Sequence, residues 1–314
     1  NMKKRIILLL IFALTLSVAQ NECGGGGESG PTITDPFIGG TGGVTINFEE
    51  GFPPEFIFDS SQTPFDVIVK LENVGEWLVP KNDVMVKIEG IRPEQFGKTS
   101  SDFIKIGVEE DLLQTKKNSE NDIIEGIPVY VDYENLAFNE KIEGNFNPPI
   151  RASVCYKYGT RAVSNICIVP DLLQPADDND LCKINENKQV FNSAGPIQVT
   201  EFKEIARSTD AISFTFKLKH KGSGLFYSPE TRCGGETASR LKNKVKINVD
   251  SGLDGLTCTG QDSDGNILLQ GGERPITCIQ RVTSQTAYEN RVNIEITYDY
   301  LEDATQYLLI KHSE

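Results

Sequence analysis

Cysteine is the residue type with the clearest chemistry in this sequence. The 314 residues include seven cysteines, and in an exported chain such a set forms a disulfide framework. Zinc binding is the alternative, but the cysteines show no CxxC spacing and no nearby histidine. We therefore expect disulfides among six of them, namely Cys155, Cys167, Cys182, Cys233, Cys258 and Cys278.

The pairing of these six is open, because six cysteines can combine in many ways. Turn signals along the chain favour hairpin bridges. Gly159-Thr160 predicts a turn between Cys155 and Cys167. Asp264-Gly265 or Gly271-Gly272 predicts a turn between Cys258 and Cys278. The pairs expected on this basis are Cys155 with Cys167, Cys258 with Cys278 and, by remainder, Cys182 with Cys233.

Calcium is the one cofactor that the sequence raises. Asp262, Asp264 and Asn266 stand at alternate positions and Glu273 follows, which places oxygen ligands at the spacing of a calcium loop. The position that needs glycine for the sharp turn of such a loop is Ile267. A hairpin turn at the Asp-Gly pair explains the same residues. We expect no cofactor and no metal site, with calcium as the alternative.

Residues for acid–base or nucleophilic catalysis are scarce. Only His220 and His312 are histidines, and the chain has no GxSxG segment. His220, between two lysines at a predicted strand end, is expected to be an exposed loop residue. The 45 acidic residues supply many carboxylate pairs, but none stands out by an apolar setting that would raise its pKa. We predict that the protein is not an enzyme and has no catalytic residues.

The charge of the chain limits its partners. Lys and Arg total 31 against 45 Asp and Glu, for a net charge of −14. No cluster of Lys and Arg interrupts this acidic field, so nucleic acid and anionic membrane surfaces are poor partners. We expect other copies of the chain or other surface proteins instead.

Residues 1–19 predict an export signal. The basic residues 3–5 precede an apolar run at 6–16, and Ser17-Val18-Ala19 forms a small-x-small cleavage site before Gln20. An uncleaved anchor is the alternative, although the apolar run is short for a membrane span. The remainder of the chain should lie outside the cell.

Residues 20–43 predict a flexible tether, because glycine and proline dominate and few apolar groups offset the entropy of ordering. Cys23 lies in this tether as the odd thiol. Lipidation would anchor it to a membrane, but residues 20–22 lack the aliphatic and small residues that usually precede a lipidated cysteine. An intermolecular disulfide or a free thiol is the alternative for Cys23.

The elements that must position these residues are strands. Apolar side chains alternate with mostly polar ones over 65–71, and the same pattern returns over 212–218. Each copy breaks at a glycine four residues after its last leucine, Gly75 in the first and Gly222 in the second. Each break is followed by a further short strand, so the chain carries a duplicated strand-break-strand unit.

The strand pattern predicts an all-β protein with two tandem immunoglobulin-like β-sandwich domains, at 44–172 and 181–314. A proline-flanked acidic run at 170–180 predicts the linker. Residues 92–125 predict a polar surface loop with a helical turn at 109–114. The predicted strands are 44–48, 55–58, 65–71, 84–88, 127–133, 150–158, 163–169, 197–202, 212–218, 244–249, 255–259, 266–269, 275–281, 292–300 and 306–311.

Four stretches together resemble a known family. They are residues 65–88, the segment from Ile150 through Cys167 to Asp171, residues 195–200 and residues 255–258. They resemble exported surface proteins of woesearchaeal and nanoarchaeal archaea that carry immunoglobulin-like domains similar to the CARDB type. The resemblance covers most of 44–300, and it implies a surface location and β-sandwiches but no catalytic residues.

We therefore expect an exported, non-enzymatic, extracellular cell-surface protein with a structural or adhesive role. Residues 41–48, which are β-prone and follow a flexible arm, are expected to add to the sheet of a neighbouring subunit and to build a filament or layer. A calcium- or carbohydrate-binding module of a surface complex is the alternative.

Overall fold

A computed structural model describes residues 35–60, 63–174 and 181–313. The predicted signal at 1–19, most of the tether, Cys23 and part of the predicted linker lie outside them. Strands make up nearly all of the regular structure, and α2 (Gly235–Leu241) is the one α-helix of the described residues. The all-β sandwich class predicted from the sequence is confirmed.

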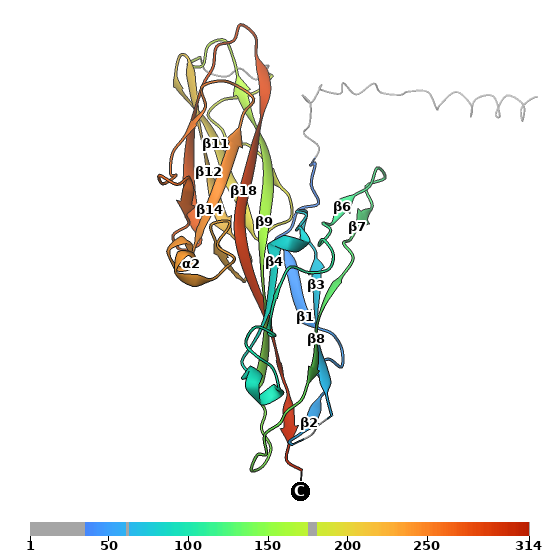
Figure 1. Ribbon diagram of the computed structural model, residues 1–314. Coiled ribbons are helices and arrows are strands. Elements are labelled where there is room, and N and C mark those ends of the chain that lie inside the picture. Colours follow the sequence, from blue (N-terminus) through green and yellow to red (C-terminus); the bar gives the residue numbers. More distant parts are fainter. Residues whose placement is uncertain (1–34, 61–62, 175–180, 314) are drawn as a thin grey trace, which may run out of the picture. The chain divides into compact units, whose positions relative to one another are not determined.

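Two long antiparallel strands organise the fold, β9 (Pro149–Ile168) and β18 (Tyr288–Tyr307). They pair over 20 residues without a register shift and lie side by side along their whole length (Figure 1). At the rise of an antiparallel strand this ladder is about 65 Å long. It forms the centre of an eight-stranded sheet. The other strands of this sheet are β4 (Val84–Glu89), β5 (Ile104–Ile106), β10 (Val190–Asn192), β13 (Leu225–Tyr227), β14 (Lys244–Asp250) and β16 (Asn266–Leu268).

Two smaller sheets complete the sandwich. One has the strand order β1-β3-β8 and the other has the order β11-β12-β17-β15. The strands of the first are β1 (Val44–Phe48), β3 (Phe65–Asn73) and β8 (Val129–Leu136). The strands of the second are β11 (Ile197–Ser208), β12 (Ala211–His220), β17 (Glu273–Arg281) and β15 (Thr257–Cys258).

Both small sheets pack on the same face of the long sheet. Because side chains alternate along a strand, the even-numbered residues of β9 all point to one face. Val154 and Ile166, near the two ends of the strand, are both buried in one continuous hydrophobic core. β1 contacts one part of the β9–β18 ladder and β11 contacts another. The sandwich is therefore one long sheet covered by two short ones.

The hairpin predicted between residues 150 and 169 is wrong, since these residues form the single strand β9. Gly159 was expected at its turn. A Cβ at Gly159 would lie 2.6 Å from the ring of Trp77. The Arg161 guanidinium lies over the same ring, 4.7 Å from its centroid. Glycine therefore serves here to let an aromatic ring approach a strand, not to make a turn.

Residues 92–125 are less of a surface loop than predicted. Phe96, Phe103 and Leu112 are buried in the core. An isolated apolar side chain in a polar segment can still pack against the core when the segment runs along it. The helical turn predicted at 109–114 is wrong. This region contains η2 (Pro93–Phe96), β5, β6 (Lys116–Lys117) and β7 (Ile123–Ile124); the remaining elements are η1 (Lys81–Asp83), β2 (Phe56–Phe58) and β19 (Leu309–Lys311).

The duplicated unit has the same role in each half. Before the break, β3 and β12 each lie in a small sheet; after it, β4 pairs with β9 and β13 pairs with β18. The division into domains at 44–172 and 181–314 stays a prediction. The long sheet contains strands from both spans, since β4 and β9 precede the predicted linker and β14 and β18 follow it.

Candidate functional site

The six cysteines of the body form three disulfides: Cys155–Cys233, Cys167–Cys182 and Cys258–Cys278. The expected pairing of Cys258 with Cys278 is confirmed, and these residues stand directly opposite each other on β15 and β17. The other two expected pairs are wrong. Cys155 and Cys167 lie on one continuous strand, and cysteines twelve residues apart on an extended strand cannot meet.

Two of the disulfides brace the long ladder. Cys155 and Cys167 both project from β9, and each binds a loop that arrives from the second half of the chain. Both cysteines of β9 are buried. Three disulfides, with their inner cysteines buried, fit an oxidising, extracellular environment. The bridges fasten the sheet to the segments that cover it.

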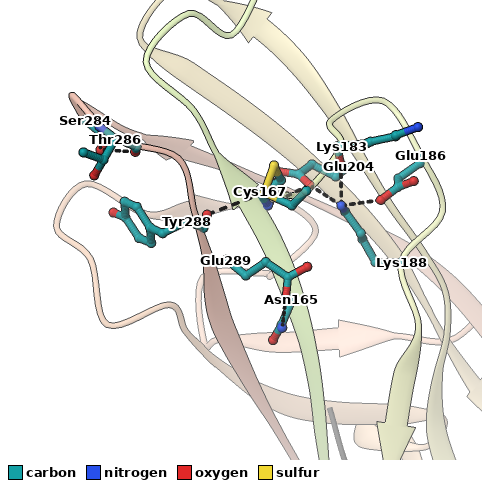
Figure 2. The surroundings of a disulfide bond; sticks show 11 residues. Asn165, Cys167, Lys183, Glu186, Lys188, Glu204, Ser284, Thr286, Tyr288 and Glu289 are labelled. Carbon is teal, nitrogen blue, oxygen red and sulfur yellow. Dashed lines mark hydrogen bonds and ion pairs between the residues drawn. A yellow bond between two sulfur atoms is a disulfide. The ribbon is translucent and has the colours of Figure 1, made fainter. Parts of the chain in front are cut away.

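A buried carboxyl group lies beside the Cys167–Cys182 bridge. Glu204, on β11, is fully buried, and the backbone N–H of Cys167 donates to both of its oxygens at 3.0 Å (Figure 2). The Lys188 ammonium lies 3.4 Å from the same carboxylate. Burial raises the pKa of Glu204 to about 7, and the Cys167 N–H and Lys188 oppose this shift.

Glu204 corrects the expectation that no acid has an apolar setting. Glu204 lies two residues after Phe202 on β11, so both side chains point to the core, where an apolar residue is usual. A β-bulge between Thr200 and Lys203 moves the buried face of β11 from odd to even residues, so the alternation of Ile197 and Val199 alone places Glu204 on the outer face. The Lys188 side chain, which also donates to Glu186 at 2.6 Å, supplies the opposing charge that permits such a burial.

A second buried carboxyl holds the loop of the Cys155–Cys233 bridge. Asp299 of β18 accepts hydrogen bonds from the N–H groups of Thr231 and Arg232, at 2.7 and 2.8 Å. Burial raises the pKa of Asp299, and these hydrogen bonds act against the shift. Arg232 and Cys233 have positive φ angles of 49° and 51°, a conformation that is rare outside glycine. The carboxylate and the disulfide together hold this strained turn against β18.

Four buried tyrosines fill the middle of the ladder, where the two small sheets adjoin. Their hydroxyls bond to segments from both halves: the Tyr156 hydroxyl accepts the N–H of Val44 at 2.9 Å, and the Tyr300 hydroxyl accepts the N–H of Gly224 at 2.9 Å. The four stand opposite each other in pairs, Tyr156 with Tyr300 and Tyr158 with Tyr298. The sequence signal for these four residues is a Tyr-x-Tyr pattern in both long strands, and none of the predictions above included them.

The candidate calcium loop forms a closed turn. Both carboxylate oxygens of Asp262 have partners within the chain, since Oδ1 accepts the N–H groups of Asp264 and Asn266 and Oδ2 pairs with Lys244 at 2.9 Å. These contacts hold the pKa of Asp262 at about 2. Glu273 pairs with Lys217 at 3.6 Å. Among the described residues, no group of three or more His, Cys, Asp or Glu gathers in a geometry that could hold a metal ion.

Both histidines have structural partners. The His220 side chain is partly buried rather than exposed as predicted, and its Nε2 lies 2.9 Å from the Tyr300 hydroxyl. Burial lowers the pKa of His220. His312 lies 2.8 Å from the buried carboxylate of Asp59, which ties the end of the chain to the residue that follows β2.

Comparison with protein-family models and with curated proteins finds no match to this chain. Within residues 35–60, 63–174 and 181–313, no helix has the length and apolar character needed to cross a bilayer.

Proposed function

We propose that this chain is an exported, non-enzymatic protein of the cell surface, with a structural or adhesive role. The observation that carries the proposal is the β9–β18 ladder, a continuous pairing of 20 residues that is braced by disulfides on β9. A long sheet with two covering sheets and covalent bridges resists deformation, which suits a part that bears load outside the cell.

The placement of the polar groups supports the non-enzymatic reading. The buried acids Glu204 and Asp299 each accept backbone N–H groups, and the two histidines bond to Tyr300 and Asp59. Each of these groups has a role in holding the fold. Turnover of any member of a polysaccharide or peptide library by the purified chain would refute this reading.

Self-assembly through an N-terminal strand is the specific form of the proposal. In the described body, β1 pairs with β3 of its own sheet, and Val44 and Ile46 are buried. Strand addition would then be an exchange, in which β1 of one copy takes the same place against β3 of the next. The contacts would be unchanged, but they would join two molecules.

A disulfide trap tests this exchange. Asn47 and Lys70 stand opposite each other on β1 and β3, so Asn47→Cys with Lys70→Cys in a Cys23→Ser background records which chain supplies β1. The matched control is Thr215→Cys with Thr277→Cys, opposite residues on β12 and β17.

If β1 exchanges, oxidation of the assembled protein links the first pair between chains and the control pair within one chain. Gel electrophoresis under non-reducing conditions then shows a ladder for the first variant alone, and electron microscopy shows the assemblies. Bridges within single chains for both variants would exclude the exchange.

A further inference from the structure

One side of the sandwich is open between two sheet edges. β8 is the last strand of the three-stranded sheet, and β5 is the last strand of the long sheet. A groove of about 570 Å³ runs between them, lined by residues of β5 and its flanking turns and by Tyr130 to Leu136 of β8. Both walls of the groove are therefore strands with a neighbour on one side only.

The backbone groups of β8 that line this edge follow from the pairing of β3. The carbonyl of Ile68 accepts a hydrogen bond from the N–H of Glu49, on the β1 side of β3. Because backbone groups of successive residues point to opposite edges of a strand, the N–H and C=O groups of Val67 and Val69 point toward β8. Their partners on β8 are Tyr133 and Val131. The N–H and C=O groups of the alternate residues of β8 point away from β3, into the open side. These alternate residues are Tyr130 and Asp132, followed by Glu134 at the irregularity in pairing that begins after Tyr133.

The edge of β5 is open over a shorter stretch, because the N–H of Ile104 bonds to the carbonyl of Ser101 in its own turn. Phe103 and Gly107 bond to β4, through the carbonyl of Phe103 and the N–H of Gly107. Since backbone groups of successive residues point to opposite edges of a strand, the N–H and C=O groups of Ile106, next to Gly107, point to the open side. A polypeptide laid along the groove in an extended conformation would thus meet unpaired backbone groups, as an added strand requires.

The floor of the groove contains a polar atom without a partner. Phe103 and Tyr133 are buried there with their rings edge to face at 6.4 Å, and the Lys105 ammonium lies 5.7 Å from the centre of the Tyr133 ring. The Tyr133 hydroxyl is buried and has no hydrogen-bond partner among the described residues. Buried hydroxyls nearly always have a partner. The Tyr133 hydroxyl is therefore an exception, on the floor of the groove.

The charges at the groove indicate which occupant fits. Asp102, Asp132 and Glu134 are among four acidic residues that line it, against two lysines. Asp132 and Glu134 are exposed, on the outer face of β8. Pairing of β8 with β8 of a second copy would bring these acids opposite each other, and like charges directly across a strand pair are destabilising. A copy of this chain, with a net charge of −14, also repels the groove at longer range.

We propose that the groove between β5 and β8 binds an extended, basic segment of another protein as an added strand. Apolar side chains of this segment pack toward Phe103 and Tyr133, and Lys or Arg at the alternate positions pair with Asp132 and Glu134. The site does not depend on the exchange of β1 or on any other self-assembly of the chain.

The test uses the full mature chain and a synthetic probe, the blocked peptide Thr-Val-Lys-Val-Lys-Val-Thr. Calorimetry measures binding, and amide hydrogen exchange measures protection along β8. We expect binding that weakens with added salt, together with slower exchange at the outward amides of Asp132 and Glu134. Failure of the peptide to bind, or binding without protection of these amides, overturns the proposal.

Charge reversal locates the site. Asp132→Lys with Glu134→Lys should weaken binding of the lysine peptide by about tenfold or more, because two attractive cross-strand pairs become repulsive. The same variant should bind a version of the probe with Glu in place of Lys. The matched control is Glu55→Lys with Glu143→Lys, two exposed acids outside the groove.

The control variant has the same net charge as the test variant and should keep wild-type affinity. Equal losses in both would mean that the general acidic field attracts the peptide and that the groove has no part in it. Circular dichroism and thermal melts verify that each variant folds. Slow exchange of the β8 amides without peptide, together with dimers in light scattering, would identify a second copy as the occupant and would also overturn the proposal.

Discussion

The buried carboxyl of Glu204 couples the stability of this fold to pH. Burial raises its pKa from 4.5 to about 7, so between these values the folded chain keeps a proton that the unfolded chain has released. Unfolding then becomes easier as the pH rises through this window, and no further loss follows once the folded group has ionised. Glu204→Gln removes the titration and keeps a side-chain oxygen that can accept the N–H of Cys167.

The magnitude follows from the two pKa values. The difference between 4.5 and about 7 corresponds to about 3 kcal/mol of unfolding free energy, at about 1.4 kcal/mol for each pKa unit. Other acids with raised pKa values, such as Asp299 and Glu302, also titrate in the wild type. They remain in the variant, so they cancel when the two proteins are compared at each pH.

Urea unfolding at several pH values between about 4.5 and about 8, with the disulfides intact, measures the effect. We expect the stability of the wild type to fall by about 3 kcal/mol relative to Glu204→Gln across this range. Glu186→Gln is the matched control, because Glu186 contacts the same Lys188 ammonium but is not buried. It should keep the wild-type profile. Parallel curves for the wild type and Glu204→Gln would refute the reasoning.

Three further predictions test other parts of the fold. Gly159→Val should destabilise the chain by about 1–3 kcal/mol, measured by urea unfolding, because its Cβ would meet the Trp77 ring at 2.6 Å; a change below the error of the measurement would contradict the packing. Replacing Cys155 and Cys233 by alanine should lower the free energy of unfolding by about 4.5 kcal/mol in the chain-entropy model. The loss should exceed that from removing the Cys167–Cys182 bridge, because 78 residues separate the first pair and 15 the second. Equal losses would argue against loop closure as the cause. Asp262→Ala should lower the melting temperature by the same amount with and without calcium, since the carboxylate holds its own turn and Lys244; a rise in the wild-type melting temperature on adding calcium, absent from the variant, would show a bound ion.

Local patterns of residue type were enough to locate most strands and the faces that they bury. Alternation of apolar and polar side chains is a local property of an extended chain, so β3, β12 and β14 were predicted close to their observed bounds. Turn signals between Cys258 and Cys278 indicated their pairing, and the two residues stand opposite each other on neighbouring strands of one sheet. The break after each copy of the repeated unit was also visible as a glycine.

How the strands join, and which side chains meet across the sandwich, depends on contacts that form only in the folded chain. Gly159 permits a turn and also permits the close approach of an aromatic ring, and the choice depends on where Trp77 lies. Once β9 runs straight through that position, Cys155 and Cys167 must find partners in distant loops. The burial of Glu204 depends in turn on Lys188 and the Cys167 amide. These contacts are long-range in sequence, and no local pattern of residue types contains them.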